Sequence, residues 1–177
     1  MTGEAGSWPD LAGRLTADGH VLPVRVYYED TDFTGVVYHA AYLKFIERGR
    51  SDFLRLCGIH HAELSDGVHG EVLAFAVRRM EIDFHAPARI DDLLEIVTRL
   101  ESARGARLCL TQEVRRAETL LFSASVTVAV ISAEGRPRRL PARLAARQDR
   151  PRPSDLARRI RVRRSSRLNR AVTLTPA

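Results

Sequence analysis

The chain has 177 residues, of which 45% are hydrophobic and 28% charged, the composition of one ordinary globular domain. It contains no apolar run near the ~20 residues that a membrane-spanning helix needs, and its two cysteines lack the close spacing of zinc or redox motifs. The net charge of +6 arises in segment 151–177, which carries eight arginines and one acid, so the nearly neutral remainder does not indicate a nucleic-acid-binding domain.

The first 20 residues mix small and polar side chains without periodicity, and we expect them to form a loose N-terminal arm. They have neither a basic start nor an apolar block, so they predict no secretory signal and a cytoplasmic location. From Pro23 onward, Val24, Val26 and Tyr28 alternate with other side chains up to Glu29, which predicts a half-buried strand. The loop-forming residues 30–35 end that strand.

A long amphipathic helix is predicted over residues 39–57. Its apolar positions recur with helical spacing and form one face, while most of the charged residues (Lys44, Glu47, Arg48, Arg50, Arg55) lie off that face. The face consists of Tyr42, Phe45, Ile46, Gly49, Phe53 and Leu56. Gly58 is a natural C-terminal stop, and residues 60–70 have room for another helical turn.

The second half of the chain predicts a meander of four antiparallel strands. The β-rich runs 72–85, 93–102, 107–116 and 120–131 are separated by turn-forming residues. One long apolar helix needs a sheet to cover it. We therefore predict an α+β hotdog fold, a long helix wrapped by a curved five-stranded antiparallel sheet, over residues 21–150. The arginine-rich tail 151–177 has too few large apolar residues to fold alone and is expected to be disordered.

Two carboxylates stand where the first strand runs into the helix. Asp30 and Asp32 precede Gly35, and a helix N-terminus near His39 offers unpaired backbone N–H groups with a partial positive charge. Such N–H groups stabilise a developing oxyanion, and a neighbouring carboxylate attacks a carbonyl or activates water. Together they are the two parts that thioester hydrolysis needs.

The motif Tyr28-x-Asp30-Thr31-Asp32-x-x-Gly35-Val36-Val37-Tyr38-His39-x-x-Tyr42, followed by Glu47-Arg48 and Arg50, resembles the 4-hydroxybenzoyl-CoA thioesterase family. The closest match is to the branch encoded beside the Tol-Pal envelope genes, and segments 77–80, 86–88 and 91–92 also resemble that branch. The likeness covers roughly residues 21–145. Two positions depart from it: Ala41 stands where Asn or Ser is common, and Gly49 replaces a more usual alanine inside the helix.

This resemblance implies an acyl-CoA thioesterase that uses no cofactor and no metal. It implies that Asp32 is the catalytic carboxylate, either as nucleophile or as general base, and that the N–H and imidazole of His39 act on the thioester. Gly35, Val36 and Tyr38 would contact substrate. Apart from the resemblance, Asp30 is interpreted as a turn former that caps local N–H groups. The family's dimers place active sites at the seam between subunits, so we expect a homodimer or homotetramer.

Two other functions remain open at this level. The first is a hotdog-fold dehydratase or a non-catalytic acyl-binding protein, although a dehydratase would be expected to use a different catalytic motif. The second is binding of nucleic acid or an anionic membrane through the arginine tail. We expect at most weak contact with an anionic membrane surface and no specific nucleic acid. His60, His61 and Glu63 are interpreted as a surface turn rather than a metal site.

Overall fold

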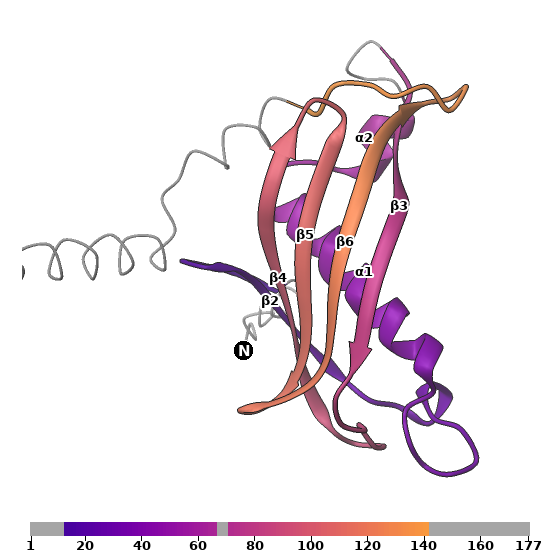
Figure 1. The fold of residues 1–177 in the computed structure, drawn as a ribbon, viewed down its shortest axis with the longest axis vertical. Coiled ribbons are helices and arrows are strands. Elements are labelled where there is room, and N and C mark those ends of the chain that lie inside the picture. Colours follow the sequence, from indigo (N-terminus) through magenta and orange to yellow (C-terminus); the bar gives the residue numbers. More distant parts are fainter. Residues whose placement is uncertain (1–12, 67–70, 142–177) are drawn as a thin grey trace, which may run out of the picture.

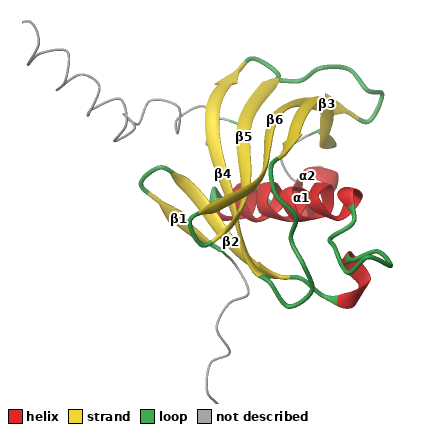
Figure 2. Ribbon diagram, turned by 60° about the horizontal axis from the view of Figure 1, so that its bottom comes forward, coloured by secondary structure: helices red, strands yellow, loops and turns green. Residues whose placement is uncertain are grey.

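A computed structural model describes residues 13–66 and 71–141, which form one curved antiparallel sheet and one long helix (Figure 1). The helix lies in the concave side of the sheet, as Figure 2 shows. This arrangement confirms the predicted α+β hotdog architecture. The arginine-rich tail lies outside the described residues. No helix in the described part of the chain is long and apolar enough to cross a membrane.

The sheet has six strands in the order β1-β2-β4-β5-β6-β3, and every neighbouring pair is antiparallel. Buried residues alternate along the central strands, because successive side chains of a strand point to opposite faces and only one face meets the helix. The strands are β1 (Arg14–Thr16), β2 (Gly19–Arg25), β3 (Leu73–Phe84), β4 (Leu93–Arg104), β5 (Arg107–Arg116) and β6 (Thr119–Ser132).

Helix α1 (His39–Leu56) confirms the predicted long helix, and a left-handed Gly58 follows its end. It packs against β2, β4 and β5, with Phe45 and Ile46 fully buried. Arg50, which we expected off the apolar face, is also buried, and it donates a 2.8 Å hydrogen bond to the Gln112 side chain of β5. A second, short helix, α2 (His61–Ser65), supplies the extra turn predicted after Gly58.

The structure corrects the expected strand count and the extent of the N-terminal arm. Residues 14–16 and 19–20, assigned to a loose arm, belong to a β1–β2 hairpin that adds a sixth strand. The sequence signal for this hairpin is Asp18-Gly19, a dipeptide typical of tight turns. Gly19 has φ +153°, and a Cβ there would lie 2.3 Å from the Thr98 carbonyl oxygen, so only glycine fits.

The first predicted strand also ends earlier than its alternation suggests. β2 stops at Arg25, and residues Tyr28–Asp30 form the 3-10 helix η1 instead of continuing the strand. The reason is local: a carboxylate oxygen of Asp30 accepts a 2.9 Å hydrogen bond from the backbone N–H of Tyr27 and bends the chain. Asp30 is only 6% exposed, which confirms its predicted structural role.

Candidate active site

The segment that carries the sequence motif folds into a closed turn leading into α1. Residues Thr31 and Val37 form an isolated antiparallel bridge, so the two ends of the turn lie side by side. The N–H of Tyr38 donates a 2.9 Å hydrogen bond to the Asp30 carbonyl. These contacts fix the position of the Asp32 turn relative to the first residue of the helix, His39.

Asp32 is exposed at the tip of this turn. Its Oδ1 atom accepts hydrogen bonds from both the hydroxyl and the backbone N–H of Thr34, at 2.5 and 2.8 Å. These two bonds, the hydroxyl's first, stabilise the charged form and hold the pKa of Asp32 below its ordinary value of 3.8. The Asp32 side chain is therefore an ionised, solvent-facing carboxylate at neutral pH.

Gly35 closes the turn in a conformation that other residues rarely adopt. Its φ is +75°, and its N–H donates a 3.0 Å hydrogen bond to the carbonyl of Asp32. In return, the N–H of Asp32 donates to the carbonyl of Val36, also at 3.0 Å. Both main-chain groups of Asp32 are thus engaged inside the turn, and the predicted substrate-contact residues Gly35 and Val36 hold its backbone.

The helix begins next to the turn with two exposed residues of the motif. Tyr38 precedes α1 without a side-chain cap, and His39 is its first residue. Their rings are in tilted contact, with centroids 4.2 Å apart. Because the first turn of any α-helix has N–H groups without intrahelical acceptors, this end of α1 can donate to an oxygen outside the helix.

A second segment, residues 85–92 between β3 and β4, supports the turn from the side. Val37 donates a backbone hydrogen bond to the Ala88 carbonyl at 2.9 Å, and Val36 forms a bridge with Arg89. The N–H of Ala88 in turn donates a 2.9 Å hydrogen bond to the buried hydroxyl of Tyr42. Tyr42, interpreted from sequence as helix core, therefore also ties this segment to α1.

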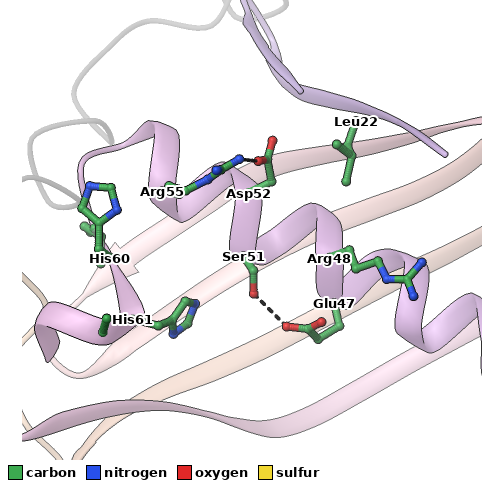
Figure 3. Close-up of a pocket in the computed structure, with 10 residues that line it drawn as sticks. Leu22, Glu47, Arg48, Ser51, Asp52, Arg55, His60 and His61 are labelled. Carbon is green, nitrogen blue, oxygen red and sulfur yellow. Dashed lines mark hydrogen bonds and ion pairs between the residues drawn. The ribbon is translucent and has the colours of Figure 1, made fainter. Parts of the chain in front are cut away.

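A cavity of about 500 Å³ lies elsewhere, beside the C-terminal half of α1 (Figure 3). None of its lining residues belongs to the Asp32 turn or to the first turn of α1. The candidate site is therefore the Asp32 turn at the start of α1, apart from this cavity. The charged and polar walls of the cavity include Glu47, Arg48, Ser51, Asp52, Arg55, His60 and His61.

One wall of this cavity belongs to a buried polar cluster that fastens the N-terminal hairpin to α1. Asp52 lies 2.7 Å from Nε2 of the fully buried His20, accepts the N–H of Gly13 at 2.7 Å, and pairs with Arg55. Because the carboxylate is an acceptor, Nε2 of His20 carries the hydrogen. Burial lowers the pKa of His20 despite the hydrogen bond and charge of Asp52.

Two histidines stand at the start of α2: His60 precedes the helix and His61 is its first residue. His60 and His61 are exposed, and the ring of His61 contacts Phe75 of β3, with centroids 5.9 Å apart. Among residues 13–66 and 71–141, no group of three or more His, Cys, Asp or Glu side chains could hold a metal ion.

Sequence reasoning missed the role of Thr34. A Thr or Ser two residues after an Asp can bond that carboxylate locally, and this spacing was the available signal. The contact between Tyr42 and Ala88 was harder to predict from the sequence, since 46 residues separate the two partners.

With this geometry in place, comparison with known proteins identifies the family. Residues 34–123 match the thioesterase superfamily. The chain belongs to this superfamily. It is 48% identical to the acyl-CoA thioester hydrolase YbgC of Escherichia coli over 126 residues. This aligned segment covers 70% of this chain and 91% of that protein. It is also 41% identical to the acyl-CoA thioesterase YbgC of Haemophilus influenzae over 114 residues, 64% of this chain and 82% of that one.

Solved structures of thioesterases share the fold. A probable thioesterase from Bartonella henselae superposes with a TM-score of 0.67 at 53% identity, covering 69% of this chain and 98% of that chain. The 1,4-dihydroxy-2-naphthoyl-CoA thioesterase of Synechocystis superposes with a TM-score of 0.57 at 27% identity, over 70% and 90% of the two chains. These matches confirm the predicted hotdog fold and family resemblance.

Proposed function

We propose that this protein is a cytoplasmic acyl-CoA thioesterase that hydrolyses a thioester to a free acid and coenzyme A with Asp32 as its catalytic carboxylate. The observation that carries the proposal is the ionised, exposed Asp32 on a turn bonded to the residue before α1. The superfamily membership and the YbgC relatives support the reaction class.

In this proposal the thioester carbonyl oxygen accepts hydrogen bonds at the N-terminus of α1, beginning with the N–H of His39. Asp32 then follows one of two routes. As nucleophile, its oxygen bonds to the carbonyl carbon, the C–S bond breaks, and water hydrolyses the resulting anhydride. As general base, it takes a proton from the water that attacks the carbonyl directly. In both routes the sulfur leaves with the bond electrons and is protonated to the free thiol.

The substitution Asp32→Asn tests this assignment because it keeps the side chain's shape and removes its charge. We expect the rate of acyl-CoA hydrolysis, measured as the release of free thiol, to fall to near background. Tm and acyl-CoA binding should stay close to wild type. Asp66→Asn, at an exposed position after α2, is the matched control and should keep full activity. Near-wild-type turnover by Asp32→Asn would exclude Asp32 as the catalytic carboxylate.

We further propose that the active protein is a homo-oligomer, a dimer at least. β3 is an edge strand, and its apolar side chains Val77, Ile82 and Phe84 are 49%, 38% and 51% exposed. They pair with Val128, Ala124 and Phe122 of β6, which are buried on the helix side of the sheet. An open edge with an uncovered apolar face favours pairing with a second copy. Light scattering that shows an active monomer at micromolar concentration would exclude this arrangement.

Finally, we propose that the arginine tail makes weak contact with an anionic membrane surface and takes no part in the chemistry. Its eight arginines give it a strong positive charge. Truncation after Arg150 should leave kcat unchanged and abolish co-sedimentation with anionic liposomes at low salt. A loss of kcat on truncation would show that the tail belongs to the folded site.

A further inference from the structure

The two carboxylate oxygens of Asp32 have different surroundings. Oδ1 accepts two hydrogen bonds, both from Thr34: one from the hydroxyl at 2.5 Å and one from the backbone N–H at 2.8 Å. Oδ2 has no hydrogen-bond partner in the part of the chain that the structure describes. The carboxylate is therefore asymmetric before any substrate arrives.

The turn itself does not need the Thr34 hydroxyl. Its backbone is closed by the reciprocal bonds of Asp32 with Gly35 and Val36 and by the bond from Tyr38 to Asp30. The backbone N–H of Thr34 adds the Asp side-chain contact common in turns. The hydroxyl supplies a second donor on the same oxygen, and two donors restrict rotation of the carboxylate more than one does.

From this asymmetry we infer that Thr34 is a positioning residue that pins Oδ1 of Asp32 and leaves Oδ2 as the oxygen that reacts. The inference rests on the proposed thioesterase function and specifies which atom of the site acts. Hydrogen bonds to a charged group are short and strong, so they draw electron density toward Oδ1 and orient the carboxylate. Oδ2 keeps its lone pairs free for the carbonyl carbon or for a proton of water, and pre-orientation lowers the entropic cost of reaching that geometry.

A paired substitution at one position tests the inference. Thr34→Val removes the hydroxyl and keeps the branched shape and the backbone N–H, whereas Thr34→Ser keeps the hydroxyl. We expect Thr34→Val to lower kcat about 3- to 10-fold, the factor that corresponds to one hydrogen bond. KM for the acyl-CoA and Tm should stay near wild type, and Thr34→Ser should restore most of kcat. Thr119→Val, at the exposed first residue of β6, controls for loss of a surface hydroxyl.

Each outcome bears on the inference directly. A wild-type kcat for Thr34→Val overturns it, and so does a loss that Thr34→Ser fails to restore, because the hydroxyl is then irrelevant. A parallel change in KM and Tm also overturns it, since Thr34 would then act through the fold of the turn. Asp32→Asn separates this result from the proposed function: if Asp32→Asn is inactive but Thr34→Val is normal, only the positioning role of Thr34 is wrong.

Discussion

Helix α1 crosses the sheet so closely at Gly49 that a side chain has no room. A Cβ at this position would lie 2.7 Å from Cγ2 of Ile96 and 3.2 Å from Oγ1 of Thr98, both on β4. Ordinary contact begins at 3.4 Å, so the neighbours would have to move. Helix propensity alone makes the opposite prediction, because alanine is favoured over glycine in a helix by about 1 kcal/mol.

The two effects can be weighed for Gly49→Ala. Ile96 is fully buried, and the hydroxyl of Thr98 accepts a 2.9 Å hydrogen bond from the side chain of Gln112, so neither neighbour moves freely. Overpacking a tight core costs roughly 1–3 kcal/mol. After subtracting the propensity gain of about 1 kcal/mol, we expect Gly49→Ala to lower the free energy of unfolding by about 1 kcal/mol.

Urea unfolding in a double-mutant cycle with Ile96→Ala is the appropriate assay, at matched protein concentration because an oligomer's stability depends on it. Ile96→Ala alone should cost about 2–5 kcal/mol through the cavity it leaves. Because it also removes Cγ2, Gly49→Ala in that background should stabilise by up to about 1 kcal/mol, the propensity gain that remains without the clash. If Gly49→Ala instead raises stability in the wild-type background, the close approach of α1 to β4 is not the reason that position 49 is a glycine.

Two further predictions follow from buried polar groups. Tyr42→Phe removes the acceptor of the Ala88 N–H and should lower the free energy of unfolding by about 1–3 kcal/mol, together with kcat; unchanged values in urea unfolding and kinetics would contradict this role. The second concerns acid: burial lowers the pKa of His20 below its ordinary 6.5, so folding favours its neutral form. The contribution of His20 to stability is fully present above pH 6.5, and it is lost as the pH falls toward the pKa that His20 has in the folded protein. Tm measured against pH should decline there, and His20→Gln, which cannot titrate, should lose that part of the slope.

Asp52 adds to this acid sensitivity at lower pH. Burial is the largest influence on its pKa and acts to raise it, but the hydrogen bonds from Arg55, His20 and Gly13 together outweigh burial and lower the pKa below 3.8. A carboxylate whose pKa is lowered by folding stabilises the protein at pH values above its ordinary pKa. This contribution is lost as the pH falls below that value. The decline of Tm in acid should therefore continue below pH 3.8 in His20→Gln.

The sequence by itself determined the features whose causes are local. The apolar spacing from Tyr42 to Phe53 predicted α1, since residues three and four apart share a helix face. Alternation and turn residues predicted β3 to β6. The motif around Asp32 predicted the family. It also predicted the place of the candidate site, because the turn closes through hydrogen bonds between residues at most eight positions apart.

Strand β1 could have been predicted but was not. Its three residues are too few to show a period of alternation, and only the Asp18-Gly19 turn signals the hairpin. The end of β2 was misplaced because alternation continues to Glu29, while the bond from Tyr27 to Asp30 bends the chain first.

Only the tertiary structure decided the remaining features, because their partners meet across long stretches of chain. Thirty-two residues separate His20 from Asp52, and 62 separate Arg50 from Gln112. No local pattern identifies such pairs: a buried arginine on a helix looks like a solvated one until its partner strand is placed beside it. Gly49 illustrates the same limit, since its sequence context indicates a weakened helix, whereas the packing of α1 on β4 makes glycine the residue that fits.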